Sequence, residues 1–371
     1  MKKEIGLYVH VPFCVRKCAY CDFASFAGRE QDEEKYVDAV LREAEARALP
    51  DAVVATLYIG GGTPSLLPPA LMDRLLSGLR KTFDFAPGAE CSCECNPGTV
   101  TPGFLSVLRA NGINRLSFGA QASQARLLSL LGRIHTWAQV RESVAMARQA
   151  GFQNINLDLM LGLPTQTADD LRETLSEALA LSPTHLSCYG LIVEEGTKMH
   201  RMVTSGAWVL PEEEEERDMY ELCRETLFRH GFEQYEISNF ALPGSACRHN
   251  MDCWKRKEYI GLGSAACGFL GNIRYQNPPD LSDYLNEKPA EETVISPGEA
   301  RFESMMLGLR MTEGVSDASF TAAHGVSIRE AFGERLDKPL RQGLIEWADG
   351  FLRLTRKGMD MQNSVLVELM E

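Results

Sequence analysis

Short apolar runs typical of strands alternate six times with longer stretches of helical periodicity in the first part of the chain. The strand-like runs are 5–11, 53–59, 89–95, 115–120, 155–161 and 185–192. The helical stretches between them are 32–49, 68–82, 102–111, 123–131 with 137–150, and 168–181. Six such units in series predict an α/β fold with parallel strands and right-handed crossovers. Both a partial barrel and a Rossmann-like open sheet fit this order.

Four of these strands have one apolar face and one polar face, because apolar and polar side chains alternate along them. Helices outside the sheet can cover the apolar faces, whereas buried polar faces need hydrogen-bonding partners. A wide, partial (β/α)6 barrel whose lumen holds a polar ligand meets this need better than a packed apolar core. The polar faces carry Tyr8 and His10; Glu90, Ser92, Glu94 and Asn96; Ser117, Gly119 and Gln121; and Asn156, Asp158 and Met160.

The alternation stops after about residue 195, which predicts a change of architecture. A helix is expected near 212–230, with its acidic run Glu212 to Glu216 at the positive end of the helix dipole. An irregular, Gly-rich stretch follows through residue 275, and then helical spacing over 299–311 and a hairpin in LIEWADGFLRLT. We predict a barrel over 1–200, an irregular extension over 201–290, and a small α/β, winged-helix-like domain over 291–371.

The composition narrows the classes of partner. A formal charge of −13 and a pI near 5.2 argue against binding to nucleic acid, which needs clustered cations. Neither a transmembrane segment nor a signal peptide is visible in the sequence, so we expect a cytoplasmic protein. Eleven cysteines at irregular spacing are a poor disulfide framework, and they point instead to metal or cluster chemistry.

Cys14, Cys18 and Cys21 form a CxxxCxxC motif in the loop after the first predicted strand, where such barrels place their active sites. A 4Fe-4S cluster needs four ligands, so three thiolates leave one iron open to a small molecule. Arg16 and Lys17 lie beside them and are expected to favour the thiolate form. A structural zinc site is the alternative, although zinc sites usually use closer CxxC pairs. The thiols of CSCEC share an apolar face and are expected to be packing residues.

Other polar residues are predicted to converge on the same mouth of the barrel. Gly60, Gly61 and Gly62 end the second strand, and consecutive glycines let a backbone approach a ligand closely. The ends of the next three strands carry Glu94, Gln121 and Asp158 on the face assigned to the lumen. A ligand-binding site is therefore expected beside the three cysteines.

These motifs resemble those of the radical S-adenosylmethionine (SAM) proteins. The resemblance covers nearly the whole chain, through YVHVPFC, CAYC, GGGTPS, ECNPG, SFGAQ, LGRIH, DLMLGLP and LIVEEGT, and it is strongest to the branch containing oxygen-independent coproporphyrinogen III oxidases and related haem chaperones. In that family a cluster held by CxxxCxxC chelates SAM at its open iron and supplies the electron that breaks the sulfonium bond. The SAM contacts implied by motif are Tyr8, Tyr20 at the adenine, Gly61, Gly62 and Thr63 at the methionine end, Glu94 at the amino group, Gln121 and Asp158 at the ribose, and Arg133 at the carboxylate.

Three features place the chain closer to the haem chaperones than to the oxidases. Phe23 stands where the oxidases have a further cysteine, and only four residues precede the first strand, where the oxidases have an N-terminal arm. RHNMDCW is similar to the HNxxYW signature of the chaperones, although Cys253 replaces its tyrosine. The resemblance implies His249 as an axial haem ligand, with Cys253 or Cys247 as another candidate.

The resemblance therefore implies a haem chaperone that uses a 4Fe-4S cluster and SAM. Its partners would be haem, a reductant for the cluster, and apo-haemoproteins such as those of a respiratory chain. The alternative is a coproporphyrinogen III oxidase that decarboxylates two propionates in porphyrin biosynthesis. The sequence leaves open whether SAM is cleaved, and therefore whether the protein is an enzyme, and whether it forms a homodimer.

Overall fold

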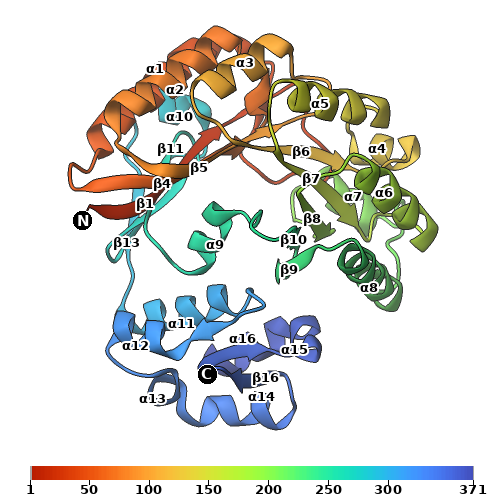
Figure 1. The fold of residues 1–371 in the computed structure, drawn as a ribbon, viewed down its shortest axis with the longest axis vertical. Coiled ribbons are helices and arrows are strands. Elements are labelled where there is room, and N and C mark those ends of the chain that lie inside the picture. The colour runs from red at the N-terminus through yellow and green to blue at the C-terminus, as the bar shows by residue number, and fades with distance from the viewer. Residues whose placement is uncertain (1, 371) are drawn as a thin grey trace.

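The computed structural model describes residues 2–370, and its centre is a curved sheet of parallel strands (Figure 1). Every predicted strand of the repeat is present and pairs with the next one in chain order. At the two ends, β1 and β8 each pair with a later strand instead of with each other, so the barrel is partial. The six strands are β1 (Lys3–Val11), β4 (Ala52–Gly61), β5 (Phe85–Cys95), β6 (Arg115–Gln121), β7 (Asn154–Leu161) and β8 (His185–Gly190).

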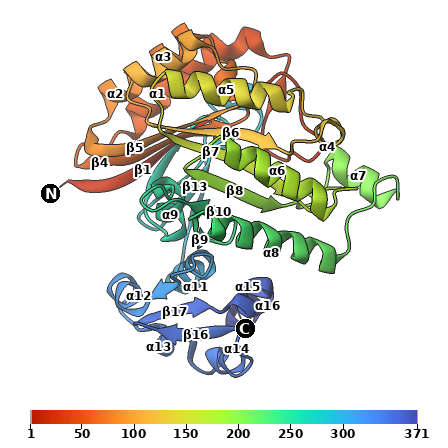
Figure 2. The ribbon, with the colours of Figure 1, turned by 45° about the vertical axis from the view of Figure 1, so that its right-hand side comes forward.

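Helices cover the convex, outer face of this sheet (Figures 1 and 2). Their N-termini begin where capping residues allow: Thr101 accepts a hydrogen bond from Phe104 N, and Thr136 and Thr167 each form a capping box. The sequence predicted all of these helices to within a few residues. They are α1 (Glu33–Arg47), α2 (Pro69–Thr82), α3 (Pro102–Ala110), α4 (Ala125–Leu131), α5 (Trp137–Gln149) and α6 (Ala168–Ala180).

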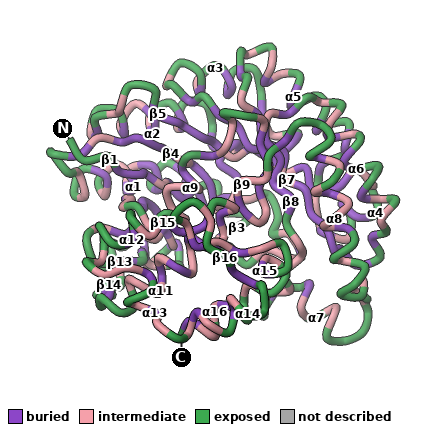
Figure 3. The backbone as a smooth tube through the Cα atoms, turned by 60° about the horizontal axis from the view of Figure 1, so that its bottom comes forward, coloured by how far each residue is buried: buried purple, intermediate pink, exposed green. Residues whose placement is uncertain are grey.

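The main hydrophobic core lies between these helices and the outer face of the sheet, as the alternation predicted. Leu116, Leu157 and Cys93 are fully buried in it, and Cys91 and Cys95 join the same cluster. The prediction that the thiols of β5 are packing residues is therefore confirmed. Figure 3 shows the same division, with buried backbone through the strands and exposed backbone at the helix surfaces and turns.

The extension is more regular than the sequence suggested, because its short strands lengthen both ends of the barrel sheet. Beyond β8, β10 (Asn239–Ala241) and β9 (Glu233–Glu236) add antiparallel neighbours. Beyond β1, β11 (Tyr259–Leu262) pairs parallel to it, and β12 (Cys267–Leu270), β13 (Ile273–Gln276) and β14 (Glu291–Val294) follow antiparallel. Strands of three or four residues are too short for a periodic pattern to show. The helices of this part are α7 (Lys198–Thr204), α8 (Glu213–Arg229), α9 (Arg248–Trp254) and α10 (Leu281–Leu285).

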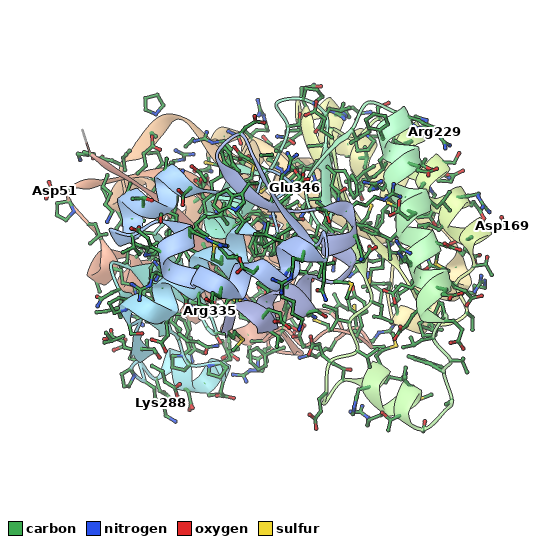
Figure 4. All side chains as sticks on the ribbon, turned by 90° about the horizontal axis from the view of Figure 1, so that it is seen from below. Asp51, Asp169, Arg229, Lys288, Arg335 and Glu346 are labelled. Atoms are coloured by element: carbon green, nitrogen blue, oxygen red, sulfur yellow. The ribbon has the colours of Figure 1, made fainter. Side chains whose placement is uncertain are left out.

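The C-terminal part has a hydrophobic core of its own, formed by buried residues from Met305 to Leu369. Its antiparallel sheet has the order β15–β17–β16, and Asp349 and Gly350 form the predicted turn with positive φ angles of 51° and 82°. Seen from below, this part, which carries Arg335 and Glu346, lies in front of the barrel (Figure 4). Its elements are α11 (Pro297–Gly308), β15 (Val315–Ser316), α12 (Asp317–His324), α13 (Ile328–Phe332), α14 (Asp337–Arg341), β16 (Ile345–Ala348), β17 (Phe351–Leu354), α15 (Arg356–Asp360) and α16 (Gln362–Met370).

A search of residues 2–370 finds no helix with the length and hydropathy needed to cross a bilayer.

Candidate functional site

The loop that carries the three cysteines follows β1 and is held by backbone hydrogen bonds to neighbouring helices. Its two ends form a short parallel pair, β2 (Phe13–Cys14) with β3 (Phe26–Ala27). In the middle, Ala19 N donates to Leu131 O at 2.8 Å, and Met199 N donates to Ala19 O at 2.7 Å. Leu131 ends α4 and Met199 lies in α7, so the cysteine loop is fixed to the helices that follow β6 and β8.

The three thiols of this loop open into one cavity of about 450 Å³. Cys14, Cys18 and Cys21 are each partly exposed, unlike the buried thiols of β5. Within residues 2–370 no three His, Cys, Asp or Glu side chains converge closely enough to hold a single metal ion. A 4Fe-4S cube requires a different arrangement, because each thiolate binds its own iron at a separate corner. The donor set of soft, accessible thiols on one wall of a cavity suits such a cluster.

Charged groups beside the thiols change the pKa of these thiols less than burial does. Burial raises the pKa of Cys14 and of Cys21, and the cation Lys17 only partly offsets this for Cys21. Arg16 donates both of its hydrogen bonds to Gly132 O and lines the same cavity as the thiols. Lys17 lowers the pKa of Cys21, as expected, but burial has the larger effect. Iron itself would keep the thiols deprotonated on binding.

The same cavity brings together most of the residues that the sequence assigned to SAM. They reach it from the ends of β4, β5, β6 and β7 and from the cluster loop. The predicted residues that line it are Tyr20, Gly61, Gly62, Thr63, Glu94, Gln121, Arg133 and Asp158.

The glycines after β4 are explained more by protein packing than by ligand approach. A Cβ at Gly60 would lie 2.8 Å from the Glu94 carboxyl carbon, and one at Gly61 would lie 2.4 Å from the His10 ring. Gly61 also has a φ of +107°, which L side chains rarely adopt. The triplet thus lets β4 fit between the cluster loop and Glu94.

Glu94 lines the cavity from the C-terminal end of β5. It accepts a hydrogen bond from the Tyr58 hydroxyl at 2.8 Å and one from Gly61 N at 3.1 Å. Burial, and then the nearby Asp158, raise the pKa of Glu94 to about 7. An ammonium group in the cavity would relieve this repulsion and favour the ionised carboxylate.

Asp158 lies across the lumen from Glu94 within a network of polar groups. It accepts hydrogen bonds from Ser117 Oγ at 3.1 Å and from Asn156 Nδ2 at 2.7 Å. Asn156 Oδ1 in turn lies 2.6 Å from His185 Nδ1. Burial raises the pKa of Asp158 above its ordinary value, and these hydrogen bonds limit the rise.

Arg133 contributes a cation at the rim of the cavity beside the cysteine loop. One of its nitrogens, Nη2, donates to Asn96 Oδ1 at 2.8 Å and to Gly119 O at 2.7 Å, and Nη1 lies 3.7 Å from Cys18 Sγ. Burial alone would lower the pKa of Arg133, but the facing Tyr20 and Cys18 raise it, so the guanidinium stays charged. Gln121 opposite has a φ of 66°, a strained conformation typical of functional sites.

Comparison with known proteins agrees with this geometry. The model of the radical SAM superfamily matches residues 8–178, and that of the HemN C-terminal domain matches residues 295–361. The heme chaperone HemW of Lactococcus lactis is 35% identical, covering 98% of this chain and 97% of its own length. The HemW proteins of Bacillus subtilis and Escherichia coli are 37% and 34% identical, covering 96% and 98% of this chain and 97% of their own lengths.

The chain belongs to the HemW family. Among solved structures, coproporphyrinogen III oxidase (HemN) from Escherichia coli superposes with a TM-score of 0.87 over 99% of this chain and 90% of its own. Because that identity is only 24%, the likeness shows a shared fold, which here consists of a partial barrel of the radical SAM type and a HemN-type C-terminal domain.

Two of the residues predicted for cofactors lie outside the cavity of this HemW-family barrel. Tyr8 is half-buried, with its hydroxyl 2.9 Å from His10 Nδ1. His249 is 5% exposed and lies in the N-terminal half of the lumen, where its Nδ1 is 3.0 Å from Thr56 Oγ1. Neither residue lines the wall that carries the cysteines.

The sequence analysis missed two residues that the HemW-family lumen uses. Asn96 lines the cavity and orients Arg133, and Tyr58 lines it and holds Glu94. Asn96 had been placed on the polar face of its strand without a role. Tyr58 could have been found by applying the same alternation to β4, because Thr56 and Tyr58 share the face opposite Leu57 and Ile59.

Proposed function

We propose that this chain is a haem chaperone that binds a 4Fe-4S cluster, SAM and haem, and that delivers haem to apo-haemoproteins. The single observation that carries the cofactor part is the cavity at the strand ends, where three accessible thiols meet Glu94 and Arg133. The haem part follows from membership in a family whose curated relatives are named heme chaperone HemW.

In this proposal each wall of the cavity binds a different part of the cofactors. Cys14, Cys18 and Cys21 hold three irons of the cluster, and Arg133 pairs with the carboxylate of SAM. Glu94 receives the amino group, and Asp158 with Gln121 faces the ribose. When bound, the cluster supplies one electron and SAM supplies a cleavable sulfonium bond.

The charges of the cavity are complementary to SAM. The residues that line the cavity include four carboxylates, Asp22, Glu94, Asp158 and Glu194, and three cations, Arg16, Lys17 and Arg133. SAM carries a sulfonium and an ammonium besides its carboxylate, so its net positive charge matches the excess of carboxylates. An adenosine without the amino-acid part would leave Glu94 and Arg133 without partners.

For haem, we propose His249 as the axial ligand. Burial, and then the nearby Arg115, lower the pKa of His249 to about 4, so its imidazole is neutral and able to bind iron. Its ring is enclosed by the lumen, so ligation requires α9 to leave the barrel first. Cys253 is partly exposed and is the second candidate.

The oxidase remains a second candidate function because the fold of HemN matches nearly the whole chain. The exposed Phe23 stands at the cavity, where the resemblance places a further cysteine in the oxidases. An anaerobic assay of the reconstituted protein with coproporphyrinogen III separates the two functions. If the protein converts coproporphyrinogen III to protoporphyrinogen IX, it is an oxidase and the chaperone proposal is wrong.

The chaperone proposal itself is tested by reconstitution without oxygen. The reduced protein is expected to give an electron paramagnetic resonance (EPR) signal that shifts on addition of SAM, and to transfer bound haem to an apo-haemoprotein. A cluster signal that SAM does not change, or haem that stays with the chain, would contradict the proposal.

The remaining parts of the proposal rest on the sequence. They are recipient proteins such as those of a respiratory chain, the reductant of the cluster, and a cytoplasmic location. A further part is the division into a barrel, an extension and a C-terminal domain, the last placed after β14 because that strand pairs with β13.

A further inference from the structure

Helix α9 lies inside the concave side of the sheet and closes the N-terminal half of the lumen (Figure 1). Its N-cap residue Cys247 supplies no side-chain cap. The carboxylate of Glu90 takes that place from β5: it accepts hydrogen bonds from Arg248 N and His249 N, both at 3.0 Å, and lies 3.6 Å from Cys247 Sγ. The first turn of α9 is thus fixed to the strand that also carries Glu94.

The other end of α9 is fixed as well. Arg256, just after the helix, donates to Glu303 of α11 at 2.8 Å, and Arg274 of β13 pairs with the same carboxylate at 2.7 Å. The position of His249 in the lumen is therefore defined from both ends of its helix.

Within the lumen, the ring of His249 is stacked on the ring of Tyr58. The centroids are 5.3 Å apart and the planes differ by 26°. Tyr8 stacks on Tyr58 at 6.4 Å and 25°. The Tyr58 ring is thus in contact with two aromatic rings, one from α9 and one from β1.

The hydroxyl of Tyr58 is the only side-chain hydrogen-bond donor recorded to Glu94 among the described residues. The direction of that hydroxyl depends on the tilt of the Tyr58 ring, and the tilt depends on the rings packed against it. Removal of the His249 ring would leave a space into which Tyr58 could turn, because closely packed neighbours define side-chain positions in a protein interior.

We propose that His249 is a positioning residue for SAM binding, which acts through Tyr58 to hold the carboxylate of Glu94 in place. The proposal rests on the SAM site proposed above. It assigns to the helix of the haem signature a second role that requires the His249 ring but none of its nitrogens.

A pair of substitutions can distinguish this role from haem ligation, because haem ligation requires a ring nitrogen and the positioning role does not. His249→Ala removes both the ring and the nitrogens, whereas His249→Phe keeps a ring against Tyr58 and removes only the nitrogens. The measured quantity is the SAM concentration that half-completes the EPR shift of the reduced cluster. His249→Ala is expected to raise it about tenfold, the effect of one lost hydrogen bond to a charged group, and His249→Phe to restore a value near wild type.

Tyr58→Phe provides the second arm, because it removes the hydroxyl through which His249 acts. It is expected to weaken SAM binding about as much as His249→Ala, and the double variant no further, since both changes remove one interaction. His249→Asn, which keeps a polar partner for Thr56 but no ring, serves in place of His249→Ala if that variant does not retain its cluster.

The outcomes are decisive in combination. Equal SAM affinity of wild type and His249→Ala, failure of His249→Phe to restore binding, or additive losses in the double variant would each overturn the proposal. If the wild-type signal does not respond to SAM at all, the proposed function fails instead, so the two failures are distinguishable. Iron content and the SAM-free EPR spectrum of each variant report whether the cluster has stayed intact.

Discussion

The two halves of the barrel lumen are both polar, yet they differ in what satisfies their polar groups. The mouth, formed by the cavity with Cys14, Cys18, Cys21, Glu94 and Arg133, opens to solvent. The floor, formed by Thr56, Glu90, Arg115, Asn156, His185 and His249, is buried. At the floor, α9 and the neighbouring strands supply hydrogen bonds to Thr56, Glu90 and His185, although the buried Nε of Arg115 has no partner within residues 2–370. The mouth leaves thiols and carboxylates accessible to a ligand.

This difference teaches that polarity alone does not identify a binding site. A polar residue in a barrel lumen can bind a ligand, or it can hold another part of the chain, as Glu90 holds α9. The following predictions test where the boundary between mouth and floor lies, beginning with the largest expected effect.

The sharpest contrast is between thiols of the mouth and thiols of the core. Cys18→Ser is expected to abolish the cluster, because a second open iron site would leave the cube without a stable set of ligands. Cys93→Ser, in the buried face of β5, is the matched control and should keep the cluster at some loss of stability. Iron and acid-labile sulfide per chain, measured after anaerobic reconstitution, check both variants, and a cluster retained in Cys18→Ser would contradict the assignment.

The floor is tested by Glu90→Ala. This change leaves two backbone N–H groups of α9 without partners and the buried Arg115 without a neighbouring carboxylate. We expect a loss of about 3 kcal/mol in the free energy of unfolding, measured with urea. Glu292→Ala, at an exposed position of β14, should change it little. A loss no larger than that of the control would show that the floor does not depend on Glu90.

The role of Glu94 in the mouth is tested by the pH dependence of SAM affinity. Because burial and Asp158 raise the pKa of Glu94 to about 7, Glu94 is protonated below that pH and cannot pair with an ammonium. SAM affinity is therefore expected to be full above pH 7 and about tenfold lower at pH 6 than at pH 8. Glu94→Gln should bind SAM weakly at both values and lose the pH dependence. Equilibrium dialysis of the reconstituted protein measures this, and a wild-type affinity that does not change with pH would place the amino group elsewhere.

The smallest effect is expected at the rim. Arg133→Lys keeps the charge but loses the planar pair of donors, so SAM affinity should fall about threefold while the cluster stays. Arg126→Lys, on the exposed surface of α4 beside Asp170, is the control and should bind SAM as the wild type does. Equal affinities of the two variants would remove Arg133 from the carboxylate site.

The sequence predicted the barrel well because its strands and helices are long enough to show their periods. Alternation along β7 separated Asp158 from the core residues Leu157 and Leu159, and the structure places them on those two faces. The cysteine spacing likewise located the mouth, because the loop after the first strand of such a barrel lies at the C-terminal ends of the strands.

The floor could not be predicted, because its contacts join distant parts of the chain without a local pattern. Nothing in the residues near Glu90 indicates that its carboxylate receives the N–H of His249, 159 positions later in the sequence. The seven residues of α9 show no apolar face that would indicate burial in a lumen. The sequence also could not show that burial changes the pKa of Cys21 more than the charge of Lys17 does, because the burial of a thiol is visible only in three dimensions.

The pairing of β1 with β11 has a consequence for the order in which the protein is made. β1 leaves the ribosome before the other strands of its sheet, but one of its edges stays unpaired until residues 259–262 have been synthesised and lie beside Gly6 to Val9. An unpaired strand edge can associate with other chains, and late long-range pairing slows folding. The cysteine loop directly follows β1, so during translation the iron-binding end of the chain is complete long before the sheet that supports it.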